Sequence, residues 1–178
     1  EQAGTPNLRV AEQYESQTLT LTIEQSCPPT PDQEQKLPFH MPVLLGLLDK
    51  DGQDLALTAD QLDTDAQFEL RDNRHSVMVN LRESTTRIAF TGLTEKPVVS
   101  FLRQFSAPVK VQYQRPSAEL DFLARHDQDG FVRWDALQSM WMSHFDVQQS
   151  GTDARPHDAV RSIAEQALTL KHSDEKLL

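Results

Sequence analysis

The change from strand to helix in this chain falls within residues 105–138, which read FSAPVKVQYQRPSAELDFLARHDQDGFVRWDALQ. As far as Tyr113, apolar and polar residues alternate, which is the period of a half-buried strand. After Arg115-Pro116-Ser117, apolar residues recur every three or four positions, which is the period of an amphipathic helix. The sequence therefore predicts a β part over residues 1–115 and a helical part over residues 116–178.

The part before this change is typical of short strands. Leu19, Leu21 and Ile23 alternate with polar residues, which predicts a strand with one buried face. Residues 43–48 are continuously apolar, as expected of a strand that is covered on both faces. Further strands are expected at residues 8–14, 68–70, 77–81, 88–90, 98–102 and 109–113. About eight short strands separated by turns favour an immunoglobulin-like antiparallel β-sandwich.

Two segments between the strands have residues typical of loops. Pro28-Pro29-Thr30-Pro31 cannot donate ladder hydrogen bonds and is expected to be a long loop or an edge crossing. Asp49-Lys50-Asp51-Gly52 is expected to be a hairpin-type turn, in which Gly52 takes a positive φ.

The helical part is expected to hold about three helices, so the fold class is mainly β with C-terminal α. Ser117 is expected to cap the first helix, and the third is expected to start near Pro156. The apolar positions of the three helices are Leu120, Leu123 and Ala124; Phe131, Trp134, Leu137, Met140 (or Trp141) and Phe145; and Val160, Ile163, Ala164, Ala167 and Leu168. Trp141 and Met142 widen the apolar arc of the second helix, which indicates that further helices normally cover it.

Composition excludes several classes of partner. The chain carries a net charge of −10, which disfavours nucleic-acid phosphates and anionic membranes as partners. No apolar run approaches the roughly 20 residues that a membrane span needs, and no signal-peptide pattern opens the chain. The single cysteine, Cys27, is expected to be a packing or loop thiol of a protein in a reducing compartment.

Four blocks, in this order, carry a resemblance to a known family. They are Gln2-Ala3-Gly4-Thr5-Pro6, Lys36-Leu37-Pro38-Phe39-His40-Met41-Pro42, Phe105-Ser106-Ala107-Pro108-Val109-Lys110, and the segment from His126-Asp127 to Arg133-Trp134-Asp135-Ala136. Together they resemble the bacterial aminopeptidase N family of zinc-dependent gluzincins. The resemblance covers the small middle β-domain of these enzymes and the start of their C-terminal helical domain.

This resemblance implies that the chain is a non-catalytic structural fragment of a longer, cytoplasmic hydrolase. Such a parent enzyme removes amino-terminal residues from peptides. A zinc-bound water attacks the peptide carbonyl, a glutamate acts as general base, and an acidic site binds the free α-amino group. The partners implied for this chain are the catalytic and C-terminal helical domains of the same parent. Its own role would be to space these two domains.

The zinc motif of the family is missing from the sequence. Gluzincins bind zinc through His-Glu-x-x-His, because residues four apart on a helix point the same way. The histidines here are His40, His75, His126, His144, His157 and His172, and no two of them lie four apart. We therefore expect no catalytic, cofactor-binding or metal residue in this chain. Zinc is expected in the parent enzyme only.

Two acidic turns resemble parts of calcium loops. In Asp49-x-Asp51-Gly52 and Asp127-x-Asp129-Gly130, the aspartates would be ligands three and five. Position one would then be Leu47 or Arg125, and position twelve Thr58 or Ala136, none of which supplies the required carboxylate. The sequence favours a turn in the first case and helix capping by Asp129 in the second.

Two clusters on the second helix have a functional and a structural interpretation. Arg133 and Asp135 flank Trp134, which is expected to point inward with the charges at its edge; Arg133 facing a substrate channel is the alternative. Met140-Trp141-Met142 is expected to make ordinary core contacts, with a partner-binding face as the alternative.

A different class of function remains open at this point. An autonomous immunoglobulin-like module could bind proteins or carbohydrates through exposed aromatic side chains. The sandwich half has no tryptophan and only two tyrosines, Tyr14 and Tyr113. An independent hydrolase that uses scattered carboxylates has only the acidic composition in its favour.

Overall fold

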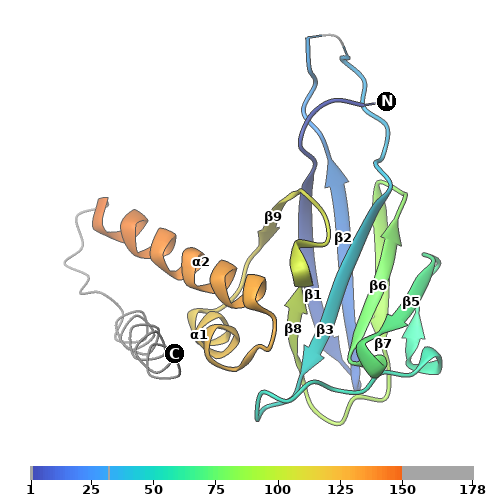
Figure 1. The fold of residues 1–178 in the computed structure, drawn as a ribbon, viewed down its shortest axis with the longest axis vertical. Coiled ribbons are helices and arrows are strands. Elements are labelled where there is room, and N and C mark those ends of the chain that lie inside the picture. Colours follow the sequence, from blue (N-terminus) through green and yellow to red (C-terminus); the bar gives the residue numbers. More distant parts are fainter. Residues whose placement is uncertain (1, 32, 150–178) are drawn as a thin grey trace, which may run out of the picture. The chain divides into compact units, whose positions relative to one another are not determined.

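The computed structural model describes residues 2–31 and 33–149, with side chains as far as Ser143. The chain divides into two compact units, Glu1–Gln114 and Arg115–Leu178. The first unit is a β-sandwich and the described part of the second consists of two helices (Figure 1).

One sheet of the sandwich has the strand order β4-β7-β2-β1-β9. Its strands are β1 (Asn7–Glu15), β2 (Thr18–Ser26), β4 (Leu62–Asp63), β7 (Thr85–Phe90) and β9 (Lys110–Tyr113). All neighbours are antiparallel except β1 and β9, which pair in parallel with Asn7 opposite Lys110. The parallel pair places the last strand of the sandwich beside the first.

The other sheet has the order β5-β6-β3-β8 and is antiparallel throughout. Its strands are β3 (Met41–Leu48), β5 (Phe68–Arg71), β6 (Ser76–Leu81) and β8 (Val98–Phe101). The predicted immunoglobulin-like fold class is confirmed, since the two sheets form a mainly antiparallel β-sandwich followed by helices. The two-residue strand β4 was not predicted from the sequence.

The core of the sandwich comes from alternating positions of its strands. On β2, Leu19, Leu21 and Ile23 are at most 1% exposed, while the threonines between them are half-buried. Every residue of β3 from Val43 to Leu48 is buried, as the continuous apolar run predicted. Burying a side chain of this size contributes about 1.5–3 kcal/mol. The core is completed by Leu8, Val10, Leu57, Val77, Val79, Leu81, Ile88, Phe90 and Val99.

The helical unit begins with α1 (Ser117–His126) and α2 (Gly130–Gln149). The prediction that Ser117 caps α1 was wrong. Pro116 is the capping residue, with extended backbone angles and no side-chain cap, and its carbonyl accepts from Glu119 and Leu120. Proline has no N–H to leave unpaired and a fixed φ, which suits the start of a helix. The third helix expected near Pro156 lies outside the described residues.

The capping of α2 by Asp129 is confirmed. Asp129 Oδ1 accepts hydrogen bonds from the backbone N–H groups of Phe131 and Val132, each at 3.0 Å. These groups have no partner within the helix, and capping them typically stabilises it by about 1 kcal/mol.

Of the predicted apolar positions on α2, Met140 is buried as expected, Phe131 and Leu137 are half-buried, and the side chain of Phe145 lies outside the described part. Val132, Ala136 and Met140 are at most 5% exposed, whereas Trp134 is 53% exposed instead of pointing inward. The exposed Trp141 and Met142 leave α2 apolar on a second side. The described part of α2 thus has apolar residues on two sides, as predicted, but the side that carries Trp134 is exposed rather than buried.

Candidate functional site

A buried arginine organises the polar interior of the sandwich. Arg103 follows β8 and is 5% exposed. Its Nε donates to Ser100 Oγ at 2.7 Å, and its Nη1 donates to Ser76 Oγ at 3.0 Å and to His75 O at 3.1 Å. Its Nη2 forms an ion pair with Asp54. Every nitrogen of the guanidinium is therefore bonded, which offsets the cost of removing this charge from water.

Gly46 provides the space for this arginine. Gly46 lies opposite Ser100 in the β3–β8 ladder. A Cβ added to Gly46 would lie 2.3 Å from Arg103 Cζ, far inside normal contact distance. The glycine inside the apolar run of β3 thus exists to admit the guanidinium. This cluster was missed at the level of sequence, and Gly46 is the signal that could have indicated it.

Two turns beside the cluster have left-handed backbone angles. Leu102, Gln104 and Phe105 have φ of 61°, 58° and 49°, and residues 72–74 have φ of 52° to 72°. Such angles cost free energy at non-glycine residues and persist only where the surroundings impose them. Arg103 lies within the first turn, and its bonds to His75 O and Ser76 Oγ connect it to the residues that follow the second. The cluster therefore connects these turns to Ser100 of β8, Ser76 of β6 and Asp54 in the segment after β3.

Three of the blocks that carry the family resemblance lie together in the sandwich. Ser106 Oγ accepts from Leu44 N at 2.9 Å, which ties the 105–110 segment to β3. Lys110 N donates to Pro6 O at 2.9 Å, which ties the same segment to the start of the chain. Gln2 in turn bonds both backbone groups of Leu37. The blocks therefore build backbone connections within the sandwich.

The three histidines whose side chains the structure describes lie in separate surroundings. His40 Nε2 lies 3.1 Å from Asn80 Oδ1, the carbonyl of His75 accepts from Arg103, and His126 stacks against Phe122 with ring centroids 4.8 Å apart. His144 lies in α2, and residues 157 and 172 are outside the described part. Within the described residues, no three His, Cys, Asp or Glu side chains come together as a metal site would require.

The first acidic turn is a local hydrogen-bonded structure. Asp49 Oδ1 accepts from the N–H groups of Asp51 and Gln53 at 2.9 and 2.8 Å, and Gly52 has a φ of 81°. This arrangement is an Asx-type turn of the kind that the sequence favoured.

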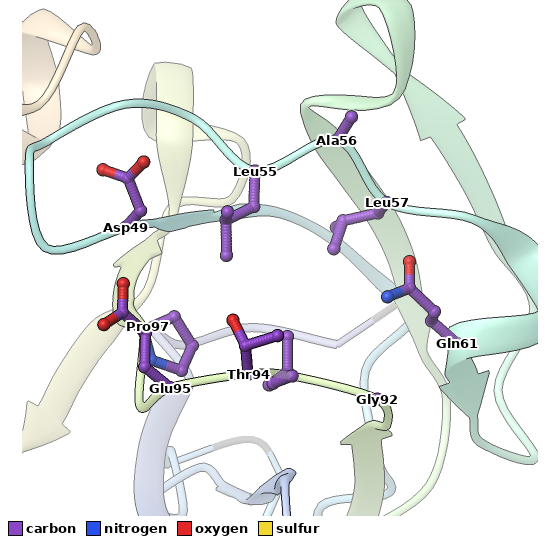
Figure 2. A pocket seen from close by; sticks show the side chains of 10 residues that line it. Asp49, Leu55, Ala56, Leu57, Gln61, Gly92, Thr94, Glu95 and Pro97 are labelled. Atoms are coloured by element: carbon purple, nitrogen blue, oxygen red, sulfur yellow. The ribbon is translucent and has the colours of Figure 1, made fainter.

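Asp49 also borders a shallow hollow of about 130 Å³ (Figure 2). Figure 2 shows Asp49 and Glu95 toward one end of the hollow and Gln61 toward the other. Pockets that enclose drug-sized ligands are usually larger, at about 300–1,000 Å³. The hollow therefore has room for one side chain rather than for a peptide. Leu55, Ala56, Leu57, Gly92, Leu93, Thr94 and Pro97 complete its lining.

The charged residues beside Trp134 act within the helical unit. Arg133 Nε donates to Ala124 O at 3.2 Å, which joins α2 to α1. Although Asp135 keeps an exposed surface, partial burial raises the pKa of its carboxyl above the ordinary 3.8, and the nearby charge of Arg115 partly opposes this shift. Of the Met140-Trp141-Met142 run, Met140 is 4% exposed and Met142 is 61% exposed. Only the first of the two methionines makes the expected core contacts.

Both tyrosines of the sandwich, which the sequence singled out for an autonomous binding module, are engaged within it, whereas Phe105 is exposed. Tyr14 is half-buried and its hydroxyl donates to Leu93 O at 3.4 Å. Tyr113 donates to a carboxylate oxygen of Glu12, and its ring meets that of Phe101 edge-on at 5.9 Å. Neither tyrosine forms an exposed platform. Cys27 is a partly exposed free thiol that lies 3.8–3.9 Å from the carbonyls of Ala3 and Thr5, as expected of a packed loop residue.

None of the helices that the structure describes has the length and apolar character needed to span a bilayer.

Two protein-family models match the chain side by side. The first, described as a domain of unknown function (DUF3458) with an Ig-like fold, matches residues 4–114. The second, described as the C-terminal DUF3458 domain with ARM repeats, matches residues 117–178.

Curated relatives carry the same regions. The chain is 36% identical over 143 residues to aminopeptidase N of Escherichia coli and 32% identical over 142 residues to aminopeptidase N of Haemophilus influenzae. These matches cover 78% and 79% of this chain. They cover only 15% of the length of each relative.

A solved structure supports the fold. Crystalline Legionella pneumophila aminopeptidase A, in complex with aspartic acid, superposes with a TM-score of 0.68 at 18% identity. The match covers 94% of this chain and 17% of that protein. Taken with the family models, these findings identify the chain as a member of the DUF3458 family, whose Ig-like and ARM-repeat domains are domains of aminopeptidase N.

Proposed function

We propose that this chain is the spacer of a zinc aminopeptidase and that it holds the catalytic and helical parts of that enzyme apart at a fixed geometry. One observation carries this proposal: the two adjoining family models cover nearly the whole chain, and the curated relatives that match the chain are aminopeptidases N. The parent would remove amino-terminal residues from peptides. Residues 1–115 would form the Ig-like spacer domain, and residues 116–178 would begin the helical domain.

The interactions within the sandwich support a mechanical role. Arg103 and its four acceptors join the two turns through polar contacts in the interior of the sandwich. The exposed apolar side of α2, which includes Trp134, suits a helix that is covered by more of the same domain.

The zinc of the parent would be held outside this chain. The sequence has no His-Glu-x-x-His, and the rings of His40 and His126 contact an asparagine and a phenylalanine ring respectively. We therefore assign no step of the reaction to residues 1–178. We also place the parent in the cytoplasm, where a lone thiol such as Cys27 stays reduced; cell fractionation tests this.

The experiment starts from the gene. Reading the coding sequence upstream of Glu1 should show a His-Glu-x-x-His motif, and the longer protein should release arylamine from an alanyl-arylamide substrate. Replacing the glutamate of that motif by glutamine should abolish the activity while the protein stays folded. An upstream sequence without a zinc motif, or activity that survives this replacement, would refute the proposal.

A further inference from the structure

The segment that precedes β1 is bonded to the loop between β2 and β3. Gln2 Nε2 donates to Leu37 O at 3.0 Å, and Leu37 N donates to Gln2 Oε1 at 2.8 Å. A single amide side chain thus satisfies both backbone groups of one residue. We call residues 2–5 the entry segment and residues 27–39 the β2–β3 loop.

Lys36 makes the second connection between these two segments. Its Nζ donates to Ala3 O at 2.8 Å, to Thr30 Oγ1 at 2.8 Å and to Gln33 Oε1 at 2.9 Å. An ammonium group has three donors, so all of them are used. Hydrogen bonds from a charged donor are roughly twice as strong as those between neutral groups. Lys36 therefore joins the entry segment to two points of the loop.

Gly4 brings the two segments into contact. It has a φ of +107°, and a Cβ added there would lie 2.8 Å from Cys27 Sγ. Beyond it, Pro6 O accepts from Lys110 N, after which β1 begins. The entry segment is consequently held along its length, unlike a flexible linker, in which neither backbone nor side chains are tied down.

The entry segment and the β2–β3 loop lie at one end of the sandwich. Figure 1 shows that the N-terminal end of the chain and the β2–β3 loop extend together past the ends of the strands. A chain that precedes residue 2 would therefore enter the sandwich where the entry segment is hydrogen-bonded to the β2–β3 loop.

We propose that the entry segment and the β2–β3 loop form a rigid joint, in which Gln2 and Lys36 are the positioning residues. The joint fixes the direction from which the preceding chain enters the sandwich. This proposal rests on the proposed function for the existence of a preceding chain and for its identity as the catalytic domain. The joint itself follows from contacts within residues 2–39.

Backbone dynamics of the 178-residue chain test the joint directly. In the wild type, the ¹⁵N order parameters of Ala3 to Thr5 should reach about 0.85, as in the strands, and in Lys36→Met they should fall below about 0.6. The matched control is Lys50→Met, which removes an exposed ammonium from the Asp49–Gly52 turn and should change nothing at the entry segment. Low order parameters in the wild type, or unchanged values in Lys36→Met, would overturn the proposal.

Amide exchange at Leu37 supplies a second readout that does not depend on how Lys36→Met folds. Gln2→Ala removes the acceptor of the Leu37 amide, which should then exchange roughly tenfold faster. Lys36→Met should also speed this exchange, although Lys36 does not touch that amide, because the entry segment would be released. Exchange at Leu37 that is unaffected by Gln2→Ala would count against the joint. Neither measurement involves zinc or peptides, so a negative result would leave the aminopeptidase proposal to its own assay.

Discussion

Replacing Gly46 by alanine should destabilise the sandwich through Arg103 rather than through β3 itself. The added Cβ would lie 2.3 Å from Arg103 Cζ and 2.4 Å from its Nη1. Carbon atoms in favourable contact are about 3.5–4.0 Å apart, so the guanidinium would have to move by roughly 1.2 Å or more.

A movement of this size removes the bonds of the cluster. The hydrogen bonds from Arg103 to Ser76 and His75 are already 3.0 and 3.1 Å long, so they would be lost together with the pairing to Asp54. Breaking a buried ion pair typically costs about 3–5 kcal/mol. We expect Gly46→Ala to lower the free energy of unfolding by a similar amount, which is a large part of the roughly 5–15 kcal/mol of a whole domain.

Amide exchange at the buried N–H groups of β3 measures this free energy for the sandwich separately from the helices. The test is a double-mutant cycle with Arg103→Ala, which removes the group that the methyl would strike. In a protein that already carries Arg103→Ala, Gly46→Ala should lower the free energy of unfolding only slightly. The control is Gly130→Ala, where an added Cβ meets nothing within 4 Å and β3 exchange should not change. If Gly46→Ala costs as much without Arg103 as with it, the reasoning about the cluster is wrong.

Three further predictions concern the helical unit. Met140→Ala should lower the free energy of unfolding by about 2–5 kcal/mol, measured by thermal unfolding followed by circular dichroism at 222 nm. Met142→Ala, at a position that is 61% exposed, should lower it by less than about 0.5 kcal/mol. Equal losses for the two variants would contradict the buried face described for α2. Asp129→Ala should cost about 1 kcal/mol in the same assay, while Asp129→Asn, which keeps a capping oxygen, should cost only a few tenths. Asp135 has a raised pKa when folded, so its contribution to stability should fall as pH rises above 3.8, the unfolded value; Asp135→Asn should therefore gain on the wild type between pH 3 and pH 7, and parallel pH profiles would refute this.

The strands could be predicted because burial imposes a simple period on them. The alternation of apolar and polar residues at Leu19, Leu21 and Ile23 predicts β2. The uninterrupted apolar run from Val43 predicts β3, a strand that is covered on both faces. The two residues of β4 were beyond such reasoning, because two residues are too few to show a period. The parallel pairing of β9 with β1 joins strands about a hundred residues apart and depends on the whole fold.

Apart from Gly46 inside an apolar run, the sequence gives no signal of the polar cluster or the joint, because their members are scattered along it. Arginine is usually exposed, so Arg103 gave no sign of being buried, and its acceptors Asp54, Ser76 and Ser100 come from three separate segments. The orientation of α2 was mispredicted for a related reason. Periodicity identifies several apolar faces on a helix that carries Trp134 and Trp141 as well as Met140, and only the contacts with α1 select among them.

Zinc content and peptidase activity of purified residues 1–178 test the central claim most directly. A spacer without a reaction centre should bind less than about a tenth of an equivalent of zinc in metal-resolved mass spectrometry and release no arylamine from an alanyl-arylamide. Stoichiometric zinc, together with turnover that a chelator abolishes, would place the catalytic centre within this chain and contradict the account.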